Sequence, residues 1–250
     1  MSEYIKELLY KMADDQLIIG HRNSEWTGLG PLLEEDIAFS SMAQDKVGQS
    51  QHLYQLLHEL GASDPDTVAF TRNAKQFHCC QLVELPIGDY SFSIVRHFLF
   101  DFAEALRFEA LSNSSFQPLA QVARKFKGEI KYHTLHANTW MQQLGNGNEE
   151  SKAKMQSALN EAWPYALGIF EKGHFENQLI ENKVFFGEEA LKQQWLDLVS
   201  PLIKKAGLKV PHDTKNTKGI GGRVGIHTEY LQPLLNEMTE VYALDPSADW

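Results

Sequence analysis

Residues 91–111 read SFSIVRHFLFDFAEALRFEAL, an apolar stretch with an acid at its centre. Ile94, Phe98, Ala105 and Phe108 lie one or two helical turns from Asp101, so their spacing predicts a helix that carries this acid on its inward face. A buried carboxylate without a partner costs on the order of several kcal/mol. The stretch therefore predicts a helical interior in which charged groups have partners.

The same stretch is too polar to cross a membrane, because Arg96, His97, Asp101 and Glu104 interrupt it well short of the roughly 18 apolar residues that a span needs. A lone histidine in such surroundings is typical of a satisfied core or interface side chain rather than a general base. The phenylalanines spread around the helix instead of following one face, which predicts burial on all sides and hence a subunit interface. They are Phe92, Phe98, Phe100, Phe102 and Phe108.

Helical spacing of apolar residues continues on both sides of this stretch. It predicts long helices over 4–22, 33–60, 91–111 and 118–144, and shorter ones over 67–80, 149–170, 188–206 and 227–242. Only 83–86 and 184–186 have a short strand-like character, and the Gly- and Lys-rich residues 207–226 are expected to form a surface loop. The sequence predicts an all-α chain, a four-helix bundle with additional C-terminal helices in a single domain, residues 1–250.

Composition narrows the classes of function. The chain has 250 residues, 43% of them hydrophobic, and a formal charge of −10, so nucleic acid and anionic lipid are poor partners. The N-terminal residues mix charges with apolar positions and do not read as an export signal, which favours the cytoplasm. Cys79 and Cys80 are adjacent, lack the spacing of a disulfide framework or a CxxC site, and are expected to be spectators.

The acids near the helix centres point to a particular class of bundle. Bundles that activate oxygen at two iron ions take a Glu from each of two helices and a Glu-x-x-His pair from each of the other two. The carboxylate half is present as Asp14 or Asp15, Asp45, Asp101 and Glu129. Both histidines are missing, because Gly48 follows Asp45 by three residues and Tyr132 follows Glu129 by three.

Two interpretations follow from this half-complete set. In the first, the positions are vestigial, and Asp14, Asp45, Asp101 and Glu129 bind Tyr132, water or each other, or pair with a cation such as Arg107. In the second, the chain is a di-iron oxygenase or oxidase with a rearranged site that uses His52, His133 or His136. An iron-storage protein is a third class, which the absence of an intact Glu-x-x-His pair disfavours.

Several motifs, in order and spacing, resemble the PaaC-type subunits of the bacterial phenylacetyl-CoA ring epoxidases along nearly the whole chain. The motifs are Ser24-Glu25-Trp26-x-Gly28, Asp45-x-x-Gly48-Gln49, Leu82-Val83-Glu84-x-Pro86-x-Gly88-Asp89, Arg96-x-Phe98-x-x-Asp101, Glu129-x-x-Tyr132-His133, Leu144-Gly145-Asn146-Gly147 and Gly221-Gly222-x-x-Gly225-x-His227-Thr228-Glu229. Tyr230 and Gln232 depart from the pattern, as does the cysteine pair.

The resemblance implies a ferritin-like, non-catalytic subunit that has lost its di-iron centre and pairs with PaaA, a homologous catalytic subunit that keeps its iron. It implies a complex that epoxidises the ring of phenylacetyl-CoA with O2, with a small bridging subunit and a reductase that passes electrons from NADPH through flavin and an iron-sulfur centre. This chain itself is expected to hold no cofactor.

The resemblance also implies ligand-contacting segments for the CoA ester, at Gln76, Phe77, His78 and Cys79 and at Gln178, Leu179 and Ile180. Six basic side chains against one acid in residues 204–223 favour a solvated loop, with the phosphates of CoA or an acidic partner as the alternative.

Overall fold

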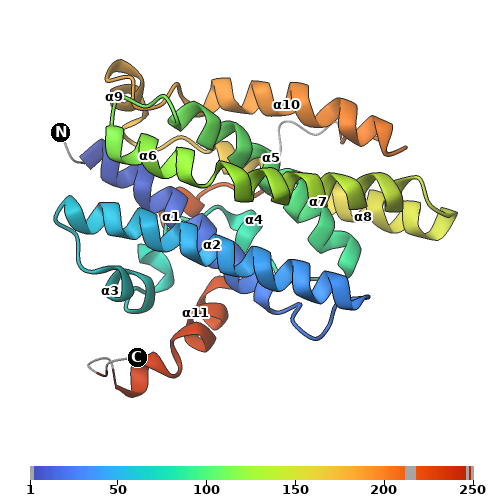
Figure 1. Ribbon diagram of the computed structural model, residues 1–250, viewed down its shortest axis with the longest axis horizontal. Coiled ribbons are helices and arrows are strands. Elements are labelled where there is room, and N and C mark those ends of the chain that lie inside the picture. The colour runs from blue at the N-terminus through green and yellow to red at the C-terminus, as the bar shows by residue number, and fades with distance from the viewer. Residues whose placement is uncertain (1–2, 212–217, 246–247, 249–250) are drawn as a thin grey trace.

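Four long helices form the centre of the computed structural model, which describes residues 3–211, 218–245 and 248 (Figure 1). They are α1 (Glu3–Ser24), α2 (Leu33–Glu59), α5 (Tyr90–Leu111) and α7 (Lys127–Gly145). α1 packs along α2, and α5 packs along α7. The described residues contain no strand, so the predictions of an all-α chain and of a ferritin-like bundle are confirmed.

The shorter helices surround this bundle. They are α3 (Pro65–Phe70), α4 (Gln81–Glu84), α6 (Gln117–Lys125), α8 (Glu149–Ala166), α9 (Glu176–Glu181), α10 (Glu188–Lys205) and α11 (Leu231–Thr239). Single 3₁₀ turns lie at Ala74–Gln76, Leu167–Phe170, Gly222–Val224 and Tyr242–Leu244. α11 lies beside α3, where the rings of Phe70 and Tyr242 are 5.3 Å apart.

Close packing of the first two helices depends on one small residue. A Cβ added to Gly20 of α1 would lie 3.0 Å from Val47 Cγ2 and 3.3 Å from the Ala43 carbonyl oxygen of α2. The missing side chain therefore lets the two helix backbones approach each other. One buried apolar cluster then continues from Ile5 in α1 to Leu235 in α11.

The predicted helix over 67–80 is wrong beyond residue 70. Asp64 caps α3 by accepting from the Thr67 backbone N–H at 3.0 Å, but the chain is extended at residues 77–80. The backbone N–H groups of His78 and Cys80 donate to Asp14 and Asp15 of α1, each at 2.7 Å. Because these donors bind carboxylates, they are not available for a helical ladder.

The predicted helix over 118–144 is divided into α6 and α7 at Phe126, whose side chain is buried against the His52 ring. Neither short strand-like segment is a strand. Residues 83–84 belong to α4, and residues 85–86 and 184–186 form connections. α9 was not predicted. No helix of residues 3–211 or 218–245 combines the length and hydropathy of a membrane span.

The phenylalanines of α5 do not require a subunit interface. Phe92, Phe98, Phe100 and Phe108 are buried by the chain's own helices, since α5 contacts α6, α7, α8 and α10. These four rings therefore give no reason to expect a subunit interface, because α5 is a central helix rather than one at the edge of the bundle, and the fifth ring, Phe102, is partly buried.

Candidate functional site

A buried ion pair lies between the central helices, where the sequence places an acid. Lys46 Nζ of α2 is 2.7 Å from Asp101 Oδ1 of α5, and neither side chain has any exposed area. His97 Nδ1 is 2.9 Å from the other carboxylate oxygen of Asp101, and its Nε2 is 2.7 Å from Asn23 Oδ1 of α1. Three helices are thus joined by one polar cluster.

The charges in this cluster are fixed by burial and by neighbours. Burial lowers the pKa of His97 to about 4, so the ring is neutral near neutral pH. Burial alone would raise the pKa of Asp101, but Lys46 and then His97 outweigh it and hold that pKa well below its usual range. The site therefore contains one carboxylate and one ammonium whose charges cancel.

The interior positions of α2 and α7 differ by one residue from those inferred from spacing. Lys46 and Gln49 of α2 and His133 of α7 are fully buried, and Ile130 of α7 is 4% exposed. Asp45 and Gly48 are partly exposed, and Tyr132 is 45% exposed. One residue corresponds to about 100° around a helix, so the positions that spacing predicts to face the interior are turned toward the surface.

This interior does not fit two iron ions. The buried residues at this spacing are Lys46 and Gln49 on α2 and Ile130 and His133 on α7, and neither pair is Glu-x-x-His. A protonated lysine has no lone pair to donate, and here it already neutralises Asp101. Of the two pairs only His133 keeps an imidazole, and its Nε2 lies 3.0 Å from Asp45 Oδ2.

The acids predicted to form a vestigial network have separate partners. Asp14 accepts from Arg72 Nη2 and Tyr54 Oη, each at 2.6 Å. Glu129 accepts from Gln49 Nε2 at 3.0 Å. Hydrogen bonds among these acids, or between them and Tyr132, are not found in the part of the chain that the structure describes. Pairing with a cation is correct for Asp14 and Asp101.

Arg107 is not the cation that binds those acids. Its guanidinium bridges Glu104, at 2.9 Å, and Glu188 of α10, at 2.5 Å. Lys11 of α1 also binds Glu188, and Gln16 binds Glu104 at 2.9 Å. This second buried cluster joins α1, α5 and α10.

The glycine-rich segment before α11 is partly buried, at Gly219 and at residues 221–223, whereas the sequence predicts a surface loop there. Arg223 is buried and binds both carboxylate oxygens of Asp15, at 2.7 and 2.8 Å. Gly222 approaches so closely that an added Cβ would lie 2.2 Å from the Cys79 carbonyl oxygen. Residues 212–217, which include Lys215 and Asp213 of the basic segment, lie outside the described residues.

The predicted substrate segments are separate in the fold and mostly have internal partners. Phe77 is buried beneath the Arg72 guanidinium, and His78 Nδ1 lies 2.9 Å from the Arg223 carbonyl oxygen. Cys79 is buried, and Gln76 Oε1 accepts from the Asn73 backbone N–H at 3.0 Å.

Gln178, Leu179 and Ile180 belong to α9, where Leu179 is buried and the other two are exposed. A cavity of 690 Å³ opens instead between residues 85–92, α8 and Tyr230, and none of the seven predicted residues lines it. Their contact with a CoA ester stays a prediction.

Sequence reasoning missed Lys46 and Gln49, although a signal was present. Phe39, Met42, Lys46, Gln49 and Leu53 recur at helical spacing on one stripe of 33–60. A lysine and a glutamine on an otherwise apolar stripe predict buried polar groups with partners. His97 was correctly predicted to be a satisfied core side chain.

The sequence model of the phenylacetic acid catabolic protein family matches residues 2–250. The chain is 33% identical over 241 residues to the C subunit of the 1,2-phenylacetyl-CoA epoxidase of Escherichia coli K12, covering 96% of each chain. It is 23% identical over 191 residues to the A subunit of that epoxidase, covering 74% of this chain and 62% of the relative. The chain belongs to the phenylacetic acid catabolic protein family.

Proposed function

We propose that this chain is the non-catalytic subunit of a multicomponent phenylacetyl-CoA epoxidase in aerobic phenylacetate catabolism. The similarity to a C-type subunit along almost the whole of both chains supports membership of such a complex. The Lys46–Asp101 ion pair in the bundle interior carries the assignment of the non-catalytic role. The reaction belongs to a homologous subunit of the A type, which would hold the di-iron centre.

The residues of this chain would stabilise a scaffold rather than bind oxygen. In the interior, the ammonium of Lys46 takes the place of the positive charge that a metal ion would supply. Asp101 therefore stays ionised without iron. Two of the three histidines that could form a rearranged site have carboxylate partners within the chain: His133 with Asp45, and His136 with Glu35 at 2.8 Å. The third, His52, has its Nδ1 2.8 Å from the Gly48 carbonyl oxygen. This arrangement argues against an oxygenase that acts alone.

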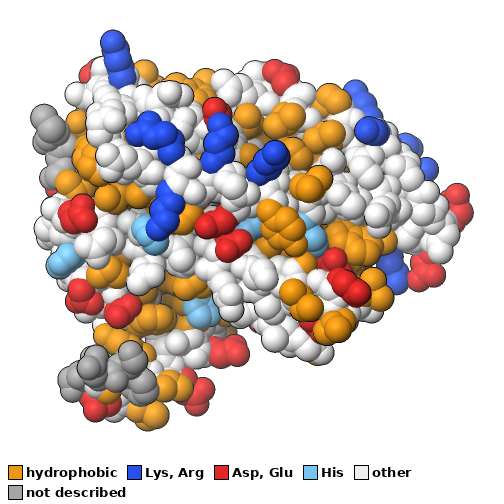
Figure 2. Space-filling model, viewed as in Figure 1, with side chains coloured by type: hydrophobic (Ala, Val, Ile, Leu, Met, Phe, Trp, Pro, Cys, Tyr) orange, Lys and Arg blue, Asp and Glu red, His pale blue; other side chains and the backbone are white. Residues whose placement is uncertain are grey.

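An apolar surface over α2 and α7 supports pairing with the catalytic subunit. Figure 2 shows hydrophobic side chains on the face that these two helices share. Gln49–Glu129 and Asp45–His133 hold the helices side by side. We define the α2–α7 surface by the exposed side chains Leu33 and Ile37 of α2 and Tyr132 and Leu135 of α7.

Scattered apolar side chains are ordinary on a protein surface, but a row of them along two adjacent helices is typical of an interaction site. Ile37 is 58% exposed and Leu135 is 63% exposed. We assign this surface to the A-type subunit. The two chains belong to one family, so each would offer its long helices to the other as the contacting elements. The bridging subunit and the NADPH-dependent reductase complete the proposed complex.

The test is co-expression of this chain with an A-type subunit, followed by mass measurement, metal analysis and turnover with phenylacetyl-CoA, O2 and a reductase. We expect a stable complex whose activity is lost when the metal ligands of the A-type subunit are replaced. Asp101→Asn in this chain should lower the stability of the complex and leave turnover per intact complex unchanged. Turnover by this chain alone would overturn the proposal.

A further inference from the structure

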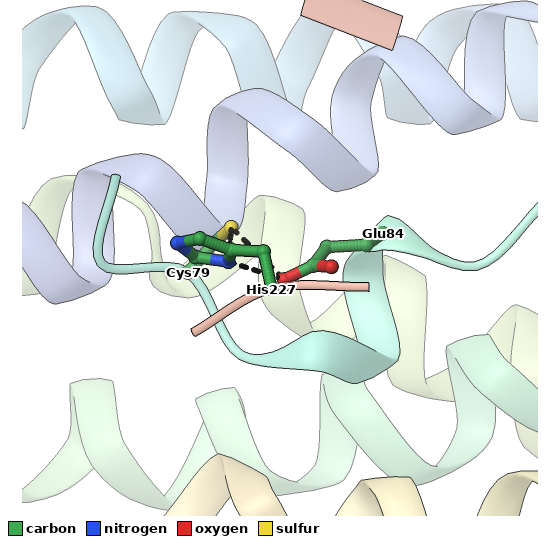
Figure 3. Close-up of side chains that lie close together, drawn as sticks. All are labelled: Cys79, Glu84 and His227. Atoms are coloured by element: carbon green, nitrogen blue, oxygen red, sulfur yellow. Dashed lines mark hydrogen bonds and ion pairs between the residues drawn. The ribbon is translucent and has the colours of Figure 1, made fainter. Parts of the chain in front are cut away.

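A second cluster of metal-binding side chains lies outside the bundle interior, where three segments meet. Cys79 comes from the extended residues 77–80, Glu84 ends α4, and His227 precedes α11. The three side chains point toward one another in Figure 3. Their donor atoms lie within 4.8 Å of one another, and their side chains are almost completely buried.

The spacing of the donor atoms is close to that of a tetrahedral zinc site. Zinc bonds of about 2.3 Å to sulfur and about 2.0–2.1 Å to nitrogen and oxygen place sulfur about 3.6 Å from the other two donors. Cys79 Sγ is 3.8 Å from Glu84 Oε1 and 3.9 Å from His227 Nδ1. His227 Nδ1 is 2.6 Å from Glu84 Oε1, and this edge would open to about 3.3 Å around a bound ion.

The groups that orient metal ligands are already in place. His227 Nε2 is 3.0 Å from the Phe77 carbonyl oxygen, so its N–H donates to that carbonyl and Nδ1 faces the cluster. Glu84 Oε2 accepts from the Thr228 backbone N–H at 2.7 Å and from its hydroxyl at 2.6 Å. The carboxylate is thereby held with Oε1 directed at Cys79 and His227.

We propose that Cys79, Glu84 and His227 form a zinc site that fastens the C-terminal segment to the extended residues 77–80 and α4. A thiolate, a carboxylate and an imidazole are the mixed donors that zinc binds, whereas magnesium and calcium prefer oxygen alone. Thiolate and carboxylate together balance the charge of the divalent ion. Three protein ligands leave the fourth position to a water molecule.

Zinc binding requires loss of the thiol proton and of the proton between His227 and Glu84. Burial raises the pKa of the Cys79 thiol well above its usual range, so the free thiol is neutral and inert without the metal. Cys79 is then a ligand, contrary to its prediction as a spectator. Cys80 is equally buried, but its backbone N–H donates to Asp15, and it is not part of the cluster. The adjacent cysteine therefore provides a matched control.

The test uses the full chain, stripped with a chelator and titrated with Co²⁺ and then Zn²⁺. Wild type and Cys80→Ser should bind one ion with the absorption of a cobalt thiolate, and zinc should raise the Tm of both. Cys79→Ser should lose this absorption and bind zinc on the order of a hundredfold more weakly or worse, since losing an outer-shell partner alone costs about 10–100-fold.

The long contacts of the Cys79 thiol predict that Cys79→Ser and Cys79→Ala fold normally, which circular dichroism would check. His227→Gln should lose zinc as well. The proposal is wrong if wild type gives no cobalt–thiolate absorption, if Cys79→Ser binds zinc as wild type does, or if Cys80→Ser loses the ion equally. The outcome is independent of the role of the chain in an epoxidase.

Discussion

Replacing Lys46 with Met tests the claim that a lysine ammonium stabilises the bundle interior. Methionine has a similar unbranched length, but it leaves Asp101 without its cation. Breaking a buried ion pair by removing one partner costs about 3–5 kcal/mol. Each kcal/mol corresponds to about 2–4 °C in a chain of this size, so we expect Lys46→Met to lower the Tm by about 10 °C.

The pH dependence of this loss follows from the pKa of Asp101. In the wild type that pKa is depressed, so Asp101 contributes stability above its unfolded pKa of about 3.9 and loses it as the pH falls through the folded value. In Lys46→Met the buried carboxylate has lost its main cation, its pKa rises, and protonation removes the buried charge. The difference in unfolding free energy between the two proteins should therefore shrink from about pH 7 toward about pH 4.

The assay is chemical denaturation followed by circular dichroism at several pH values. The double variant Lys46→Met/Asp101→Asn removes both charges and should recover most of the lost stability, because uncharged replacements of buried pairs are often neutral. Lys127→Met is the control: its pair with Glu109 is exposed, and the change should stay below about 1 kcal/mol. The reasoning is refuted if Lys46→Met is as stable as wild type, or if the double variant is less stable than the single one.

Three further predictions concern a buried histidine, the C-terminal segment and the partner surface. The pKa of His97 is about 4 in the folded chain and about 6.5 in the unfolded chain, so folding favours the neutral ring. About 3 kcal/mol of stability should therefore be lost as the pH falls from about 6.5 to about 4. His97→Gln should flatten this part of the curve of stability against pH, and an unchanged curve would contradict the assignment. Arg223→Met leaves the buried Asp15 carboxylate without its cation, which should cost about 3–5 kcal/mol and expose the segment before α11 to limited proteolysis. Lys205→Met on the surface should have neither effect. Leu135→Asp should weaken binding of the A-type subunit at least about tenfold without changing the Tm, whereas Leu198→Asp on α10 should leave binding intact. Equal effects of the two variants on binding, measured by titration calorimetry, would rule out the α2–α7 surface as the site that binds this subunit.

Much of the fold follows from local information in the sequence. The positions of the long helices depend on apolar periodicity and on caps such as Asp89, which accepts from the Phe92 backbone N–H at 2.9 Å. The inward direction of Asp101 follows from the apolar side chains on either side of it in the helix. These features are set within a few residues, so the sequence alone predicts them.

The register of the interior could not be obtained in this way. Asp45 and Lys46 are neighbours in sequence but about 100° apart around α2, and the search for metal ligands favours the acid as the interior residue. The structure buries the lysine because its partner comes from α5, more than fifty residues away. Pairing of distant charges decided which residue faces inward, and one helix considered alone does not contain that information.

The same reason explains why the sequence predicts two other segments wrongly. Residues 77–80 are extended because their N–H groups bind acids of α1, and Arg223 is buried because it binds Asp15. Gly and Lys are common in loops, so composition favours a surface loop for 207–226. Asp14 and Asp15 therefore anchor chain segments, and this function is visible only when the partners are in place.

The most direct test of the central claim is the iron content of the isolated chain after anaerobic reconstitution with Fe²⁺ and removal of excess metal. The measurement should be made in Cys79→Ser as well, so that binding at the proposed zinc site is counted separately. We predict that the bundle interior of Cys79→Ser retains no stoichiometric iron, because Lys46 already neutralises Asp101. Two iron ions per chain in this variant, lost on Asp101→Asn, would contradict the account.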